Sequence, residues 1–174
     1  MKNIVLIGMM GTFKTTSGKI VAKILKKKFI DTDKILSSRF RMSIEKYFKV
    51  FGEQAFREQE QKLCLELSQA SDSVISTGGG IIKNSQNIEN LKKNGVIICL
   101  MASPDEIYSR IKNSHTRPLL KSSDPLNKIK KILAEREQLY IQSAQTVIYN
   151  DNISAQHTAQ EIIQFINQNQ KLFD

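Results

Sequence analysis

The chain has 174 residues, 40% hydrophobic and 25% charged, which fits one globular domain. Its 26 Lys and Arg against 17 Asp and Glu leave a net charge of +9, which favours anionic partners such as nucleic acid, a membrane surface or phosphorylated small molecules. Two cysteines are too few for a disulfide framework and no apolar run reaches the roughly 18 residues of a membrane span, so we expect a cytoplasmic protein.

Short apolar runs alternate with helical patterns along the whole chain. In chain order the patterns predict strand 4–7, helix 15–27, strand 29–30, helices 34–40, 44–51 and 53–70, strand 73–76, helix 86–93, strand 96–101, helices 104–112 and 125–140, strand 145–149 and helix 154–167. Ser103 before Pro104, and Asp124 before Pro125, are expected helix caps. The alternation predicts an α/β protein with a central parallel sheet, whose ligands bind beyond the carboxyl ends of the strands.

The segment between the first strand and the first helix fits the phosphate-binding P-loop pattern except at one residue. The pattern is Gly, four residues, Gly, Lys and Ser or Thr, and the chain reads Gly8-Met9-Met10-Gly11-Thr12-Phe13-Lys14-Thr15. Lys14 would reach the β- and γ-phosphates and Thr15 would bind Mg²⁺. If position 13 requires a positive φ, Phe13 costs about 1–3 kcal/mol there; otherwise the loop shifts and loses a contact to phosphate. A glycine-containing turn before a basic helix is the alternative interpretation.

Two carboxylates, Asp31 and Asp33, follow the second predicted strand. While the chain stays extended, alternate residues point the same way, so both could face one ligand. A kinase needs carboxylates near Mg²⁺ and one that orients or deprotonates the accepting hydroxyl. Asp33 as the N-cap of the helix over 34–40 explains the pattern equally well, and the two interpretations stay open.

Glycines and arginines mark further candidate positions. Gly78-Gly79-Gly80 follows the third strand, where it would let a ligand approach the main chain, although a tight turn would also use it. Only six of the basic residues are arginines. Arg57, with Glu60 three residues later, and Arg136, between two acids, are also compatible with solvated helix positions. Arg117 lies in a polar loop, as a solvated residue or as part of a lid over polyphosphate.

Taken together, these segments resemble the shikimate kinases. The segments that match in order and spacing are 8–15, Asp31-Thr32-Asp33, Gly52-Glu53…Phe56-Arg57…Glu60, Gly78-Gly79-Gly80, Arg117-Pro118-Leu119-Leu120 and Arg136…Leu139-Tyr140. The resemblance covers essentially the whole chain. It implies an α/β, three-layer P-loop fold like that of nucleoside-monophosphate kinases, with a five-stranded parallel sheet flanked by helices. It also implies a single domain over 1–174, with a shikimate-binding helical region at about 33–62 and a lid at about 112–124.

The resemblance implies ATP-dependent phosphorylation of the 3-hydroxyl of shikimate, with Mg²⁺, as a step toward chorismate and the aromatic amino acids. It implies catalytic roles for Asp33 as base, Lys14 and Arg117. The nucleotide contacts that it implies are Gly8, Gly11, Thr12, Phe13, Lys14, Thr15, Thr16, Arg110 beside adenine, and Arg117; the metal contacts are Thr15 and Asp31. The shikimate contacts that it implies are Asp33, Phe48, Phe56, Gly79, Gly80 and, gripping the carboxylate, Arg57 with Arg136.

The chain departs from the family at Phe13, where the family carries Gly. We expect an active or weakened, monomeric kinase whose partner is shikimate and that binds neither nucleic acid nor a membrane. The alternatives are a shikimate-binding protein with nucleotide binding impaired at Phe13, a kinase of another small polyol such as gluconate, and a nucleic-acid-binding module.

Overall fold

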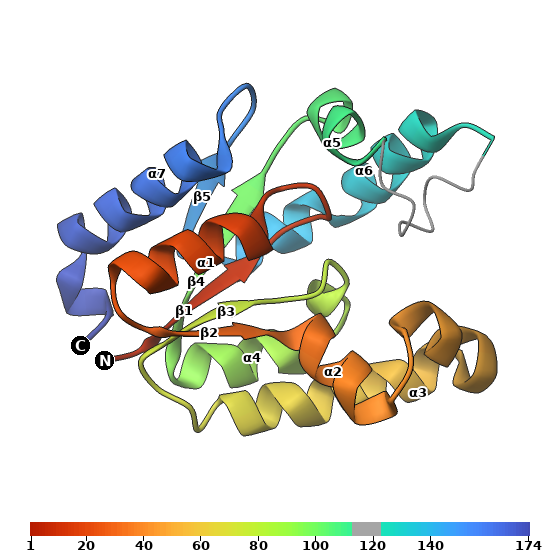
Figure 1. The fold of residues 1–174 in the computed structure, drawn as a ribbon, viewed down its shortest axis with the longest axis horizontal. Coiled ribbons are helices and arrows are strands. Elements are labelled where there is room, and N and C mark those ends of the chain that lie inside the picture. The colour runs from red at the N-terminus through yellow and green to blue at the C-terminus, as the bar shows by residue number, and fades with distance from the viewer. Residues whose placement is uncertain (113–122) are drawn as a thin grey trace.

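Five parallel strands form the centre of the protein in a computed structural model that describes residues 1–112 and 123–174 (Figure 1). The strand order is β2-β3-β1-β4-β5. β1 (Asn3–Ile7) lies in the middle, between β3 (Ser73–Ser76) and β4 (Gly95–Met101), while β2 (Lys28–Asp31) and β5 (Thr146–Tyr149) form the edges. The predicted five-stranded parallel sheet is therefore confirmed.

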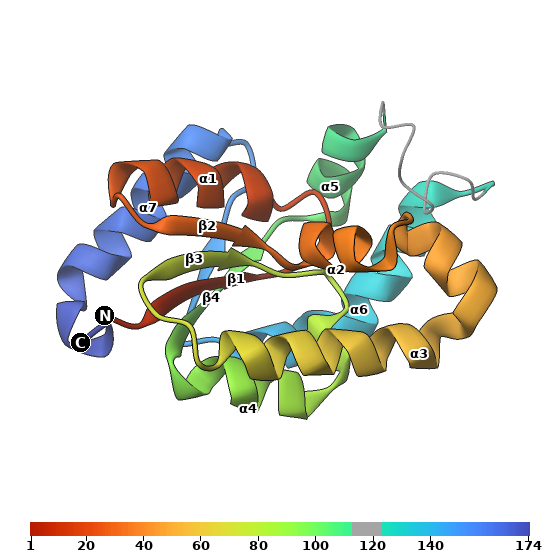
Figure 2. The same ribbon diagram turned by 60° about the horizontal axis from the view of Figure 1, so that its bottom comes forward.

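Helices cover both faces of the sheet, so the fold has three layers, with the sheet between two layers of helices (Figures 1 and 2). α1 (Lys14–Ile24) and α7 (Ala155–Gln168) pack against one face. The other helices are α2 (Thr32–Phe40), α3 (Ile44–Leu67), α4 (Ser85–Lys93), α5 (Pro104–Ile111) and α6 (Pro125–Ser143), with 3₁₀ turns η1 (Ile81–Lys83) and η3 (Gln170–Leu172). Side chains of α3, α4 and α6 fill the core on the second face.

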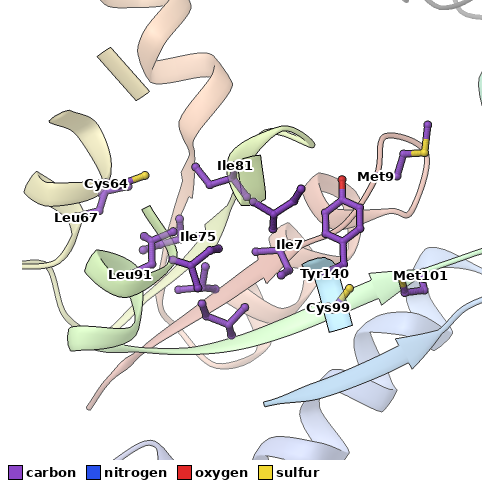
Figure 3. Close-up of a cluster of buried hydrophobic side chains, with 14 of the residues drawn as sticks. Ile7, Met9, Cys64, Leu67, Ile75, Ile81, Leu91, Cys99, Met101 and Tyr140 are labelled. Carbon is purple, nitrogen blue, oxygen red and sulfur yellow. The ribbon is translucent and has the colours of Figure 1, made fainter. Parts of the chain in front are cut away.

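The strands divide their side chains between two apolar cores, one on each face. Ile4 and Leu6 join the core beneath α1 and α7, while Val5 and Ile7 join the other. All four side chains are fully buried, as the period-two geometry of a central strand requires. Figure 3 shows the second core, where the ring of Tyr140 packs beside Ile7 near the carboxyl end of β1. The sheet is thereby fixed on both sides, and its carboxyl edge supports the loops described below.

Several helix boundaries follow the local signals. Ser103 caps α5 by accepting the backbone N–H of Glu106, and Asp124 caps α6 in the same way. The predicted break between the helices over 44–51 and 53–70 falls inside α3, where Gly52 has the non-helical angles φ 82° and ψ 169°. Caps and a helix-breaking glycine therefore act as expected.

One predicted cap is wrong. Asp31, not Asp33, caps α2: its Oδ1 accepts the backbone N–H of Lys34 at 3.1 Å. The helix begins at Thr32, so Asp33 lies in its first turn. The two carboxylates are therefore not alternate residues of an extended segment, and their spacing does not aim them at one ligand by strand geometry.

The first helix ends earlier than predicted. α1 stops at Ile24 because the chain reverses at Lys26, which has φ 53°. Ile24 is 55% exposed, whereas the Lys27 side chain is 6% exposed and pairs with Asp72. The lysine-rich end of the helix is thus partly folded onto the protein.

Two expectations from composition can be compared with the fold. Cys64 and Cys99 are free thiols, in agreement with the expected lack of a disulfide framework, and both are buried; burial raises the pKa of Cys99 to about 12. Over residues 1–112 and 123–174, none of the helices combines the length and the apolarity that a bilayer crossing requires.

Candidate functional site

The loop from Gly8 to Thr15 connects the central strand to α1 with a backbone that uses left-handed angles. Gly11 has φ 81° and Phe13 has φ 64° and ψ 12°. Phe13 therefore adopts the positive φ that glycine takes readily, at a cost of about 1–3 kcal/mol for a side chain with a Cβ. At Gly8 a Cβ would overlap the carbonyl oxygen of Leu100, so no larger residue fits there. We call this segment the phosphate loop.

The start of α1 supplies a cation, Lys14, and a hydroxyl, Thr15, that joins oxygens from the ends of β2 and β3 in a cluster. Lys14 is 8% exposed and its Nζ donates to the carbonyl of Met9 at 2.7 Å. Thr15 Oγ1 donates to Asp31 Oδ2 at 3.1 Å and lies 3.2 Å from Ser76 Oγ. Because Mg²⁺ prefers hard oxygen ligands and is held by one or two carboxylates together with substrate phosphates, these three oxygens fit a magnesium site at the loop.

The phosphate loop borders a cavity of about 380 Å³, which we call the phosphate-loop cavity. Its lining residues are Met10, Gly11, Phe13, Lys14, Thr15, Thr16, Asp31, Asp33, Thr77, Gly79, Arg110 and Ile111. Two predicted nucleotide contacts, Gly8 and Thr12, are not in this lining. The Thr12 hydroxyl instead donates to the carbonyl of Met9 at 2.8 Å, so it stabilises the conformation of the loop.

A second cavity of about 280 Å³ lies beside the first, and we call it the arginine cavity. Its lining residues are Met9, Met10, Asp33, Ile44, Phe48, Phe56, Arg57, Glu60, Gly78, Gly79, Gly80, Ile132 and Arg136. It gathers all seven predicted shikimate contacts. Met10, Asp33 and Gly79 belong to both linings, so the two cavities meet at these residues.

Arg57 is held by two acids of its own helix. Its Nη1 donates to Glu60 Oε2 at 2.7 Å, and its Nη2 and Nε donate to Glu53 Oε1 at 3.0 and 3.2 Å. The interpretation of Arg57 and Glu60 as a solvated pair is wrong, because Glu60 is 2% exposed. Burial raises the pKa of Glu60, although Arg57 opposes the shift. Burial would lower the pKa of Arg57, but Glu60 and Glu53 outweigh it and raise the value, so the guanidinium stays charged.

Hydrogen bonds tie the glycine run after β3 to two helices, α2 and α6. The backbone N–H of Gly78 donates to Thr32 Oγ1 at 3.1 Å. The carbonyl of Gly79 accepts from Arg136 Nη1 at 3.3 Å and from the hydroxyl of Tyr140. Burial raises the pKa of Tyr140 to about 12, with Arg136 opposing, so the hydroxyl keeps its proton at neutral pH. The run is therefore a fixed floor rather than a loose turn.

Close packing against this floor positions two charged groups. A Cβ at Gly78 would lie 2.6 Å from Asp33 Oδ1, and a Cβ at Gly80 would lie 2.7 Å from Arg57 Nη1. Glycine at these positions leaves the space that Asp33 and Arg57 occupy. The predicted close approach at the glycine run is thus made by the protein's own side chains as well as being available to a ligand.

Sequence reasoning missed several residues that support the site. Tyr140, Glu53 and Ser76 each contact a predicted site residue, as described above. Weak signals existed: Tyr140 is one helical turn after Arg136, and Glu53 is one turn before Arg57. Arg117, which was expected to be catalytic and to contact the nucleotide, lies outside the described residues, as does most of the predicted lid.

Comparisons with known proteins agree on one family. The family model described as shikimate kinase matches residues 10–167. Curated shikimate kinases from Caldanaerobacter subterraneus subsp. tengcongensis and Thermodesulfovibrio yellowstonii are 44% and 41% identical over 163 residues, covering 94% of this chain and 95% and 94% of the relatives. A solved structure of shikimate kinase from Acinetobacter baumannii, in complex with shikimate, matches with a TM-score of 0.92 at 33% identity, over 97% of this chain and 94% of that one.

Proposed function

The chain belongs to the shikimate kinase family, and from that premise we propose which of its residues bind ATP, Mg²⁺ and shikimate and transfer the phosphoryl group. The activity is that of a shikimate kinase, phosphorylation of shikimate. One observation supports the proposal most directly. Asp33 lies where the phosphate-loop cavity and the arginine cavity meet, so a single carboxylate borders both the donor and the acceptor.

The phosphate-loop cavity takes the nucleotide in this proposal. Backbone N–H groups of the loop and the N-terminus of α1 face the phosphates, and Lys14 provides a cation at the β- and γ-phosphates. Thr15 and Asp31 hold Mg²⁺ in the oxygen cluster described above, with Ser76 beside them. Bound there, ATP would supply the phosphoryl group and Mg²⁺ would neutralise part of the charge on its phosphates.

The arginine cavity takes shikimate. Arg57 and Arg136 hold its carboxylate, because two guanidiniums offer planar, bidentate donors that lysines lack. The backbone of Gly79 and Gly80 supports the ring, and Phe48 and Phe56, whose rings lie 4.7 Å apart, form the apolar wall. Binding of a small carboxylic acid with ring hydroxyls uses each of these surfaces.

Asp33 orients the 3-hydroxyl of shikimate and accepts its proton. The bond that forms joins the 3-oxygen to the γ-phosphorus, and the bond that breaks joins that phosphorus to the leaving oxygen of ADP. The hydroxyl proton passes to the Asp33 carboxylate and from there to solvent. Because phosphoryl transfer is loose, the proton leaves late, and positioning contributes more than basicity.

A coupled assay of ADP release tests the proposal. We expect shikimate-dependent turnover with Mg-ATP, no comparable turnover with gluconate, and a loss of kcat of about 10²-fold or more in Asp33→Asn. Calorimetry with shikimate checks that this variant still binds the acceptor. If the wild type shows no shikimate-dependent turnover at millimolar Mg-ATP, the proposal is wrong.

We further infer that the chain acts as a monomer. The described residues that we propose for nucleotide and shikimate binding come together within one chain, so none of these roles needs a second copy. Light scattering under the conditions of the activity assay measures the molar mass in solution. Activity that is found only in a dimer would contradict the inference.

A further inference from the structure

Phe13 is held in its left-handed conformation by a specific neighbour, Arg110 of α5. The Arg110 Cζ lies 3.9 Å from the centroid of the Phe13 ring, within the range of a cation–π contact. Both residues line the phosphate-loop cavity. The ring is half-buried rather than turned out to solvent. A side chain that is unfavourable for the backbone at this position therefore makes a contact that glycine has no atoms to make.

Four hydrogen bonds and an ion pair hold the guanidinium of Arg110 within the protein. Nε and Nη2 contact Glu106 Oε1 at 2.9 and 2.8 Å, Nη1 donates to Asn150 Oδ1 at 2.9 Å and to the carbonyl of Gly11 at 3.1 Å, and Nη2 also donates to the carbonyl of Asn150. Contacts on all three guanidinium nitrogens leave the group little freedom to rotate. The Arg110 side chain is 8% exposed, and its Cζ lies over the Phe13 ring.

The same network holds the residues before Phe13. Arg110 restricts the backbone at Gly11 by donating to its carbonyl, and Asn150 Nδ2 donates to the carbonyl of Thr12 at 3.0 Å. Three successive residues of the phosphate loop are thus attached to α5 and to the end of β5, two through carbonyls and the third through its ring. Loop freedom that would have to be lost on binding phosphate is already removed.

We propose that Phe13 is a positioning residue for the nucleotide: its ring, stacked on Arg110, holds the phosphate loop in the conformation that binds polyphosphate. The inference rests on the proposed function, because it takes the phosphate-loop cavity as the nucleotide site. It gives the opposite sign to the idea that Phe13 merely impairs the loop. An impaired loop predicts that Phe13→Gly tightens nucleotide binding, whereas loss of the stack predicts that it weakens binding.

Calorimetry with Mg-ADP tests the proposal through a double-mutant cycle. Phe13→Leu keeps a Cβ and an apolar side chain but removes the aromatic face, and Arg110→Met removes the cation. We expect Phe13→Leu to weaken Mg-ADP binding by about three- to thirtyfold, the range of a cation–π contact, and to have little further effect in the Arg110→Met background. Arg110→Gln, which also removes the cation but keeps an amide donor for the carbonyl of Asn150, replaces Arg110→Met if the latter fails to fold.

Kinetics distinguish positioning from a general loss of structure. In Phe13→Leu we expect KM for ATP to rise while KM for shikimate stays within about twofold of the wild type. Phe29→Leu is the matched control, because it removes another ring under a cation, with Lys19 Nζ 5.9 Å from the ring centroid, outside both cavities. It should leave Mg-ADP affinity unchanged.

Each outcome separates this inference from the proposed function. A wild type that turns over shikimate while Phe13→Leu and Phe13→Gly bind Mg-ADP as tightly or more tightly overturns the inference alone. An equal effect of Phe13→Leu in both Arg110 backgrounds also overturns it, because the stack is then not the cause. A wild type that binds no Mg-ADP overturns both.

Discussion

Gly80 offers a test of how the arginine cavity is built, because a single methyl group there meets Arg57. The backbone at Gly80 has φ −100° and ψ 3°, which alanine adopts without strain. The added Cβ would lie 2.7 Å from Arg57 Nη1 and 2.9 Å from its Cζ, and closer still to Nη2. Atoms in such a contact prefer separations of about 3.5–4.0 Å, so the guanidinium has to retreat by about 1 Å.

The size of the effect follows from what Arg57 binds. A hydrogen bond to a charged group contributes about 1.5–3 kcal/mol, and a retreat of this size misaligns one such bond to the shikimate carboxylate. We therefore expect Gly80→Ala to raise KM for shikimate by about ten- to hundredfold, with kcat within about threefold because Asp33 and the phosphate loop are untouched. Shikimate titration in the coupled ADP-release assay measures both constants.

The neighbouring Gly78→Ala is the matched comparison. Its Cβ would lie 2.6 Å from Asp33 Oδ1, so it displaces the proposed base and should lower kcat more than it raises KM. Arg57→Lys sets the upper limit for the Gly80 effect. The reasoning fails if Gly80→Ala leaves KM within twofold while Arg57→Lys raises it, or if the two alanine variants change the same constant by the same factor.

Two further predictions concern groups that support the site. Burial raises the pKa of Glu60, so the folded state binds its proton more tightly than the unfolded state does, and wild-type stability falls as pH rises from the ordinary carboxylate range through the raised pKa. Glu60→Gln removes this pH dependence. In urea denaturation, the free energy of unfolding of the variant relative to the wild type should therefore increase with pH. A difference between the two proteins that does not vary with pH would contradict the prediction. Tyr140→Phe removes the hydroxyl that donates to the Gly79 carbonyl and should destabilise the protein by about 1 kcal/mol. Tyr149→Phe, at a residue that is 61% exposed, should change stability little, and equal losses in the two variants would refute the assigned contact.

Local chemistry made much of the fold predictable. Capping by Ser103 and Asp124 depends on neighbouring residues in the chain, and so does the break at Gly52, so composition and spacing carry those signals. The full burial of the run 4–7 follows from its lack of polar residues. Features of this kind are decided within one turn or one strand, and the structure departs from them by few residues.

The remaining features depend on packing between distant segments. The sequence does not distinguish Asp31 from Asp33 as the cap of α2, and Asp31 becomes the cap because β2 ends there and the helix begins at Thr32. Glu60 is buried beside the glycine run, where its Oε1 lies 3.5 Å from the position of a Cβ on Gly78, and no i, i+3 spacing can indicate this contact. The positive φ at Phe13 could be stated as a condition, but its stabilisation by Arg110 joins residues far apart in the chain. The roles of the site residues themselves stay predictions.

The central position of β1 has a consequence for synthesis of the chain. Asn3–Ile7 leaves the ribosome before either of its partner strands, since Ile4 pairs with Val74 on one side and with Val96 on the other. Until those segments emerge, an almost wholly apolar strand has two open edges, which are templates for pairing between chains. Parallel pairing of such distant segments is also slow. The topology that places the phosphate loop at the middle of the sheet thus leaves the nascent chain exposed to aggregation until β4 has also been made.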